Sequence, residues 1–336
     1  MTRLKNWIPW LLLIGFVLVY PMVFGIVLTN LFVRFAIFAV FAASLNMLLS
    51  FTGLLSFGHA MFFGVGGYAT ALALENIPGL GLMTCMAIGG LSSSLLALIV
   101  SPILVRVKDT AFALLTLALG QILFLACLKL RGITHGEDGV GGFPIPPFRI
   151  PGFLSIDMGH PQSFYYFAVA VCALSLFLMW YATRTPFGSI MAGIRDNQLR
   201  VNYLGFNIAV TKTIMFLISG CFAGVAGALF ALFQNLVSPD GVFSVMTSFT
   251  PIMMVFVGGI GTFAGPIIGS AVLTSLEDLA TRYTEQILLI NGLLLICVVI
   301  FFRGGFIGLF KTIKQKRFAN SREMPDGHPG DEISIP

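Results

Sequence analysis

The sequence predicts an all-α, polytopic integral membrane protein. Of its 336 residues, 57% are hydrophobic and only 10% are charged, and the mean hydropathy is +0.95. A soluble domain of this length needs far more polar surface. The apolar residues also gather in runs of about 20, the length that a helix needs to cross a bilayer. We therefore expect a membrane domain over residues 1–310 and a cytoplasmic tail over residues 311–336 that is first basic, then acidic, and disordered.

The first apolar run follows Arg3 and Lys5 and is too long for the core of a signal peptide. It predicts a retained first span with its N-terminus inside the cell. The first seven predicted spans cover residues 8–28, 31–51, 59–74, 83–105, 111–130, 163–183 and 213–236.

Residues 243–279 are long for one span, and a glycine-rich segment at 258–266 that ends in Pro266 interrupts them. If they formed one helix, the basic tail at 303–322 would lie outside, against the positive-inside rule. Two spans, 243–259 and 263–279, followed by a last span at 287–302, give about ten helices and return the C-terminus to the cytoplasm. A second glycine-rich helix break is predicted near residues 52–58.

A faint internal repeat relates the two breaks. Gly53, Ser56 and Phe57 recur at an offset of 206 residues as Gly259, Thr262 and Phe263. Transporters are often built from repeats, although three matches in apolar sequence are weak evidence.

The seventh predicted span carries rows of small residues. Gly220 and Gly224 form a GxxxG pair, and Ala223, Gly227 and Ala231 form a second row. This pattern predicts tight packing on another helix, and a dimer seam is the weaker alternative.

Two long polar loops separate the spans. Residues 131–162 are rich in Gly and Pro, and their nearly balanced charge is typical of an outside, periplasmic loop. Residues 184–212 are basic and therefore predicted to be cytoplasmic. No proline or glycine lies between Gly193 and Gly205, so the pattern predicts a short amphipathic helix that ends at Gly205. A soluble partner would bind this helix. The alternative is a plain loop on the bilayer surface.

The apolar stripe of this predicted helix consists of Ile194, Leu199, Val201 and Leu204.

No sequence motif indicates catalysis. The chain lacks a phosphate-binding GxxxxGKS or GxxxxGKT motif and an HExxH motif, so we expect no ATP site, cofactor or metal. Gly259, Gly261 and Ala264 fit GxGxxA, but between membrane spans we interpret them as a helix break. An intramembrane protease pair of Ser219 and His59 is conceivable and is set aside. The five cysteines lie in apolar runs and form no CxxC pair. The net charge of +5 is explained by orientation signals, and we expect no nucleic acid partner.

Polar residues at or near a helix break are candidates for a permeation path, because unwound backbone is tolerated only beside protein or a water-filled cavity. For each residue, helix packing is the alternative. The candidates are Thr52, Ser56, His59, Thr116 and Gln121.

Four collinear stretches of the chain carry a family resemblance: NMLLSFTGLLSFGHAMFFGVGGYATALAL from Asn46, FALLTLALGQIL from Phe112, AGIRDNQLRVNYLGFNIAVTKTIMFLISGCFAGVAGALFA from Ala192 and VFVGGIGTFAGPIIGSAVL from Val255. Together they resemble the LivM-type permease of the branched-chain amino acid ABC importer family. FFRGGFIGLF from Phe301 is similar to the family's C-terminal end. The resemblance implies a multi-pass protein of the bacterial inner membrane that lacks enzymatic activity of its own. The implied partners are a LivH-type permease, two cytoplasmic ATPases and a periplasmic substrate-binding protein.

The resemblance also gives the loop helix a role. In such importers a cytoplasmic EAA-like helix that ends in a glycine docks on the ATPase, and the matching positions here are residues 194–205. This chain has Asn-Gln-Leu-Arg at 197–200 where the family tends to have acidic residues followed by alanines. The implied docking residues are Ile194, Arg195, Leu199, Arg200, Leu204 and Gly205.

Two alternatives stay open at this point. A related permease for urea or short amides shares the architecture. A stand-alone secondary transporter or channel would need buried ionisable residues, of which the predicted spans hold almost none.

Overall fold

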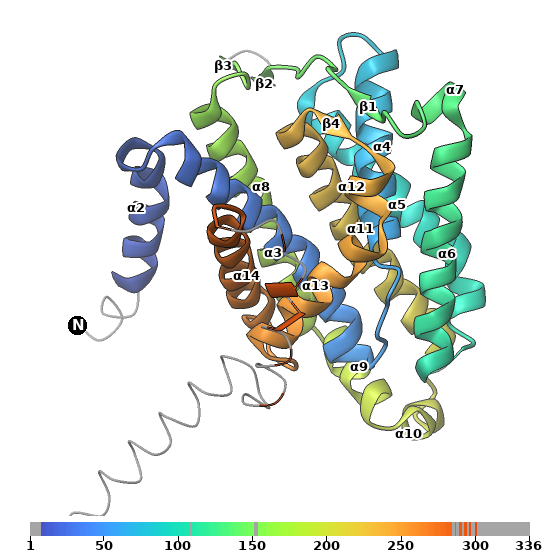
Figure 1. Cartoon of the computed structure of the whole chain (residues 1–336). Helices are drawn as coiled ribbons and strands as arrows, with labels where there is room; N and C mark the ends of the chain where they lie inside the picture. The colour runs from blue at the N-terminus through green and yellow to red at the C-terminus, as the bar shows by residue number, and fades with distance from the viewer. Residues whose placement is uncertain are drawn as a thin grey trace, which may run out of the picture.

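The computed structural model describes residues 8–107, 109–150 and 154–283, with a few isolated positions between 286 and 300. The described chain is mainly helical (Figure 1). Its helices are α2 (Ile8–Val23), α3 (Ile26–Thr52), α4 (Ala60–Asn76), α5 (Leu82–Leu104), α6 (Asp109–Lys129), α7 (Arg131–Thr134), α8 (Pro161–Arg184), α9 (Pro186–Asp196), α10 (Gln198–Tyr203), α11 (Ile208–Gln234), α12 (Pro239–Phe243), α13 (Val245–Gly258) and α14 (Gly265–Thr281). Its strands are β1 (Val140–Gly141), β2 (Phe148–Ile150), β3 (Leu154–Ile156) and β4 (Leu236–Val237).

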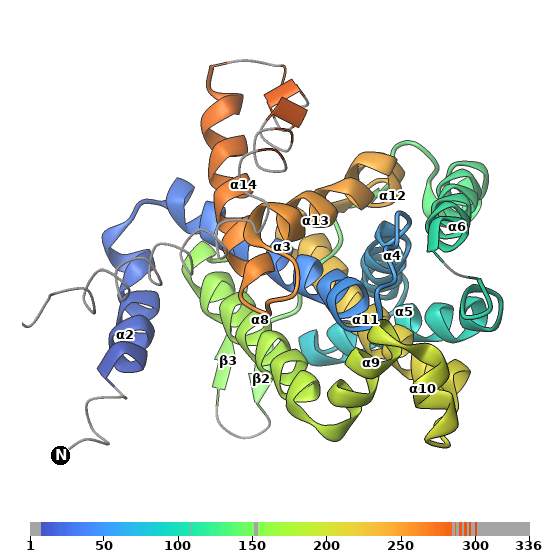
Figure 2. The same ribbon diagram turned by 90° about the horizontal axis from the view of Figure 1, so that it is seen from below.

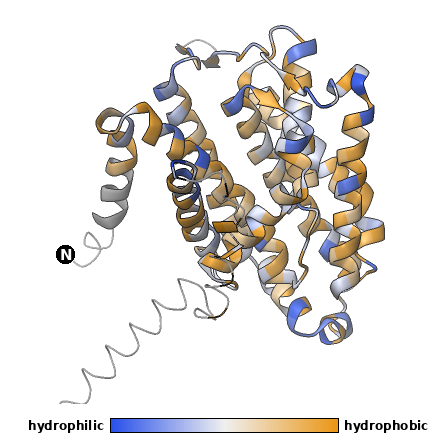
Figure 3. Cartoon of the chain, in the orientation of Figure 1, coloured by the Kyte–Doolittle hydropathy of each residue, from blue (hydrophilic) through white to orange (hydrophobic). Residues whose placement is uncertain are grey.

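Six helical segments of the described chain are long and apolar enough to cross a membrane, so the predicted polytopic all-α class is confirmed. They lie in α3, α5, α6, α8, α11 and the α12–α13 pair. In Figure 3 hydrophobic residues dominate these helices, and hydrophilic ones gather at the two ends of the bundle. The predicted number of about ten membrane-spanning helices was only approximate. Helices α2, α4 and α14 have only 16, 17 and 17 residues, and the predicted span 287–302 falls mostly outside the described residues. The predicted tail 311–336 lies wholly outside them.

The first two helices meet a few residues earlier than predicted. The turn lies at Phe24 and Gly25 rather than between residues 28 and 31, and Gly25 caps α3 in an extended conformation. Pro21 inside α2 has no N–H for the carbonyl of Val17, four residues back. The hydroxyl of Tyr165 on α8 donates to that carbonyl at 3.0 Å. A hydrogen bond from α8 therefore satisfies the group that Pro21 leaves free, as a bilayer requires.

The core lies where α4, α5 and α11 cross, and glycines bring these helices together. A Cβ on Gly224 would lie 2.5 Å from the carbonyl oxygen of Gly89 on α5. A Cβ on Gly227 would lie 1.9 Å from the carbonyl oxygen of Phe63 on α4. The predicted tight packing of these small residues is therefore confirmed. The alternative of a dimer seam is wrong for this face, because it is already occupied within the chain.

Both predicted helix breaks are present. Helix α3 ends at Thr52, and Gly53 has a φ of +72°. The segment 53–59 then runs back into the bundle without regular structure and leads into α4 (Figure 1). Helices α13 and α14 pack against each other as a hairpin, with Gly259 at φ +115° in the turn. A Cβ on Gly258 would lie 1.7 Å from the carbonyl oxygen of Gly265, so this crossing excludes a side chain.

The loop 131–162 is more ordered than its Gly- and Pro-rich composition predicts. It contains α7 and the antiparallel hairpin of β2 and β3. Strand β1 pairs with β4, which directly follows α11, in the register Val140 with Val237 and Gly141 with Leu236. The sequence gives no sign of the β1–β4 pairing, because the partners of β1 lie almost a hundred residues away and leave no local pattern.

Candidate functional site

The predicted docking segment forms two helices instead of one. The sequence predicts a single helix over residues 194–205, but α9 begins at Pro186, ends at Asp196 and is followed by α10. Asn197 between them has φ −159° and ψ 100°, and its side-chain oxygen accepts a hydrogen bond from the N–H of Arg200 at 3.0 Å. Asn197 thus serves as the N-cap of a new helix. The signal was present in the sequence, because Asn is a preferred cap and Pro186 a preferred first residue.

The break divides the predicted apolar stripe. Ile194 and Val201 are buried, and Val201 packs against Gly193 where α9 and α10 meet. Leu199 and Leu204 are 68% and 70% exposed, and the neighbouring Tyr203 is 86% exposed. Half of the stripe therefore holds the two helices together, while the other half presents apolar side chains outward. We call Leu199, Tyr203 and Leu204 the α10 trio.

Gly205 ends α10 as predicted. Its N–H donates to the carbonyl of Asn202 at 3.0 Å, and the N–H of Phe206 donates to that of Val201 at 3.4 Å. This pair of bonds is the Schellman termination of a helix. The φ of Gly205 is +90°, and a Cβ there would meet no atom within 4 Å. Glycine is therefore favoured at this position because of its backbone conformation, and a larger side chain would have space.

A groove of about 320 Å³ lies between α9 and α10. Its lining includes Ser189, Ile190, Gly193, Val201, Leu204 and Phe206. Helices α9 and α10 lie at the end of the bundle opposite the paired strands β1 and β4 (Figure 1).

Arg195, a predicted docking residue, points toward α3. One of its terminal nitrogens donates to the backbone carbonyl of Ser50 at 2.6 Å, and its Nε bonds Asp196 at 3.0 Å. Figure 2 shows α9 beside the end of α3 in the view from below. Both Arg195 and Arg200 are exposed, and Arg195 in addition bonds the end of α3.

Three of the predicted path residues lie along the first break. Thr116 on α6 accepts a hydrogen bond from the N–H of Phe57 at 3.1 Å, and a Cβ on Gly58 would lie 1.8 Å from the carbonyl oxygen of Thr116. Ser56, His59 and Thr116 are all buried. The segment 53–59 therefore lies directly on α6.

His59 lies between α3 and α4. Its Nε2 is 2.9 Å from the hydroxyl of Ser44, whose proton goes to the carbonyl of Phe41 at 2.7 Å. With the Ser44 proton on that carbonyl, Nε2 would be the donor of the bond between His59 and Ser44. Neither Nδ1 nor the hydroxyl of Ser56 has a partner in the described part of the chain. Ser219 bonds the carbonyl of Ser44 and not His59, so the two do not form a protease pair.

The other two predicted path residues lie apart from these. Thr52 is buried and bonds the carbonyl of Leu48 within its own helix. Gln121 is half-buried and lies five residues after Thr116 on α6, about 140° around the helix from it. Gln121 therefore does not share the face of α6 on which Thr116 contacts the first break.

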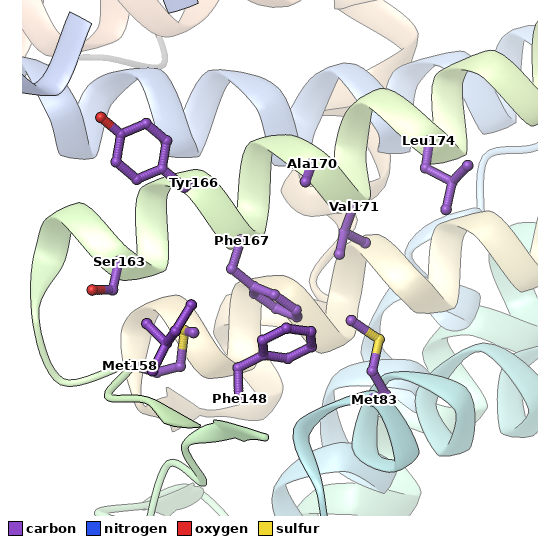
Figure 4. A pocket seen from close by; sticks show the side chains of 10 residues that line it. Met83, Phe148, Met158, Ser163, Tyr166, Phe167, Ala170, Val171 and Leu174 are labelled. Atoms are coloured by element: carbon purple, nitrogen blue, oxygen red, sulfur yellow. The ribbon is translucent and has the colours of Figure 1, made fainter. Parts of the chain in front are cut away.

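An apolar groove of about 470 Å³ runs along α8 (Figure 4). Phe148 of β2 and Phe167 of α8 lie at its centre, with Met83 of α5 beside them (Figure 4). None of the predicted site residues lines it. Among the described residues no cluster of His, Cys, Asp or Glu is suited to hold a metal ion.

Comparison with known proteins places the chain in a family. The protein family described as the permease component of branched-chain amino acid transport systems matches residues 27–302 of this chain. The chain is 28% identical to the high-affinity branched-chain amino acid transport system permease protein LivM of Escherichia coli, over 86% of this chain and 72% of the relative. It is 28% identical to the LivM protein of Salmonella typhimurium, over 79% of this chain and 66% of the relative.

The LivH permease protein of Escherichia coli is 23% identical over 81% of this chain and 91% of the relative. No solved structure matches. The chain thus spans about two thirds of the length of the LivM relatives, and the resemblance to LivM-type permeases is confirmed. The match over residues 27–302 covers most of the helical bundle, and the chain is a multi-pass inner-membrane protein of the family of branched-chain amino acid transport permeases.

Proposed function

We propose that this chain is a permease subunit of an ABC importer for branched-chain or closely related amino acids. The observation that carries this proposal is the family match over residues 27–302. The names of the LivM and LivH relatives support a pairing of this chain with a LivH-type permease. Two cytoplasmic ATPases would supply the energy, and a periplasmic binding protein would deliver the substrate. The chain itself would perform no enzymatic step.

The α10 trio is the proposed ATPase contact. Leu199, Tyr203 and Leu204 expose apolar surface on the polar loop between α8 and α11. Such a patch, rimmed by polar residues, is typical of a protein interaction site. Arg200 would pair with an acidic residue at the rim, where a surface ion pair contributes about 0–1 kcal/mol. ATP binding would close the ATPases and switch the permease pair between outward and inward access.

The path through the membrane is proposed to follow the first break. Ser56, His59 and Thr116 are the candidates that the geometry supports, because two of their buried polar atoms lack a partner in the described residues. Thr52 and Gln121 remain weaker candidates. Alanine substitution at each of the five positions should reduce uptake at one or more of Ser56, His59 and Thr116. Normal uptake by all five variants would leave these residues as helix-packing groups.

Both termini are proposed to be cytoplasmic, with residues 184–212 inside and residues 131–162 outside. The α9–α10 loop and the strands β1 and β4 lie at opposite ends of the bundle, which supports this orientation. A cysteine replacing Lys314 in the tail should stay unlabelled by an impermeant reagent added to intact cells. Labelling from outside would contradict the orientation.

Uptake by cells tests the substrate. A bacterial strain without its own branched-chain amino acid importers would express this chain with its neighbouring permease, ATPase and binding-protein genes. We expect uptake of labelled leucine that unlabelled isoleucine and valine inhibit and that urea does not. Inhibition by urea or acetamide alone would instead favour a permease for short amides.

A further inference from the structure

The last turn of α3 is bonded to the turn between α13 and α14. The hydroxyl of Ser50 accepts a hydrogen bond from the N–H of Gly261 at 2.9 Å and donates to the side-chain oxygen of Asn46 at 2.5 Å. The side-chain amide of Asn46 donates to the carbonyl of Thr262 at 3.1 Å. The second helix break is therefore held by two side chains of α3.

The same turn is bonded to the docking loop and leads into the first break. The carbonyl of Ser50 accepts from Arg195 of α9 at 2.6 Å, and Gly53 lies against the side chain of Arg195. The carbonyls of Leu48 and Leu49 accept from the N–H groups of Leu54 and Gly53, so they are already used by the turn. The carbonyl of Ser50 lies at the C-terminal, negative end of the α3 dipole, which favours the positively charged guanidinium of Arg195 there. One residue, Ser50, thus bonds α9 through its carbonyl and the second break through its hydroxyl.

The contact between Arg195 and Ser50 is suited to transmit a movement of α9 to the end of α3. Ser50 and Asn46 are buried, and α3 and α9 are regular helices. The segments beyond them are irregular, with glycines at positive φ, Gly53 on one side and Gly259 on the other. Hinge motions are absorbed by a few such residues at the ends of elements, while the elements themselves stay intact.

We propose that Arg195 is a positioning residue that transmits the displacement of the ATPase-docked α9 to both helix breaks through Ser50. This inference rests on the proposed function, since it requires an ATPase bound to the α9–α10 loop. It assigns Arg195 to the contact with the end of α3 and leaves ATPase binding to the α10 trio. It also makes both breaks respond to the same contact between Arg195 and Ser50, although the breaks lie about 200 residues apart in the sequence.

The test measures substrate transported per ATP hydrolysed by the complete transporter in proteoliposomes. In Arg195→Ala the ATPase should stay bound and hydrolyse ATP. Transport per ATP should fall roughly tenfold, the factor that corresponds to one charge-assisted hydrogen bond. Ser50→Ala removes the bond to Gly261 but keeps the carbonyl, and should lower the same ratio. Arg195→Lys should recover part of it, because an ammonium group still donates to the carbonyl.

Two comparisons make the test specific. The double variant Arg195→Ala with Ser50→Ala should be no worse than the more damaged single variant, since residues of one network are not additive. Arg106→Ala removes an exposed positive charge at the same end of the bundle and should keep the wild-type ratio.

Three outcomes would overturn the proposal. They are loss of the ATPase from Arg195→Ala, a parallel fall of hydrolysis and transport, or a normal ratio in Arg195→Ala and Ser50→Ala. A wild-type complex without ATP-driven transport would instead refute the proposed function. A thermal unfolding measurement on each purified variant separates loss of coupling from loss of the fold.

Discussion

Truncation of the exposed leucines of α10 should weaken ATPase binding without harming the fold. Leu204 is 70% exposed and Leu199 is 68% exposed, so either substitution by alanine removes few contacts within the chain. Exposed substitutions usually change the free energy of unfolding by no more than about 0.5 kcal/mol. Both variants should therefore insert and purify like the wild type.

The expected loss at the interface follows from the area that is still free to be buried. Full burial of a leucine contributes about 1.5–3 kcal/mol, so burying the exposed 70% of Leu204 contributes about 1–2 kcal/mol. Leu204→Ala should thus weaken ATPase binding roughly 5- to 30-fold. Leu199→Ala should act similarly, and the double variant should lose more than either one.

The assay is the dissociation constant between the permease pair in nanodiscs and the purified ATPase. Leu91→Ala on α5 is the matched control, because Leu91 is 67% exposed but lies on a membrane helix away from the loop. It should leave the dissociation constant unchanged. Equal affinities for Leu91→Ala, Leu199→Ala and Leu204→Ala would refute the assignment of the α10 trio.

Three further predictions concern the fold. Gly227→Ala should prevent the close approach of α11 to α4 and destabilise the protein by about 1–3 kcal/mol, measured by thermal unfolding. Gly90→Ala is the matched control and should destabilise the protein less, because its Cβ would first meet side-chain atoms at 3.1 Å or more and not the backbone. Gly205→Asn should be tolerated better than Gly205→Val, measured as ATPase retention, because Asn adopts positive φ far more readily than a β-branched residue and φ there is +90°. Tyr165→Phe should destabilise the protein by about 1–3 kcal/mol by leaving the carbonyl of Val17 without its donor, and equal melting temperatures of this variant and the wild type would contradict that assignment.

The membrane class and both breaks were predictable because their causes are local. Apolar runs of about 20 residues predict spans, and clustered glycines predict places where a membrane helix ends. Gly53 and Gly259, the pair at an offset of 206 residues, both adopt positive φ. The internal repeat that this pair suggested stays a prediction.

The docking loop was predicted in part. Its position, its terminal glycine and its amphipathic character follow from composition and spacing. The break at Asn197 was missed, because an apolar stripe was followed across a residue that prefers to cap a helix. The interpretation of Leu199 and Leu204 as exposed docking residues stays a prediction.

The remaining features depend on contacts between distant segments. Arg195 and Ser50 are 145 residues apart, and Ser50 and Gly261 are 211 apart. The pairing of β1 with β4 is also non-local. No periodicity within a single segment indicates which side chains will meet in this way, so Arg195 was assigned to the docking surface from its position alone.

ATP-driven transport of leucine across the membrane of proteoliposomes tests the central claim most directly. The complete complex of both permeases, two ATPases and the binding protein would be reconstituted with its ATPases facing outside, so that binding protein and leucine are trapped in the lumen. We predict that leucine leaves the lumen only when ATP is added outside, and that a hydrolysis-deficient ATPase abolishes the transport. Leucine movement by this chain without ATPases, driven by a proton or sodium gradient, would contradict the account and establish a secondary transporter.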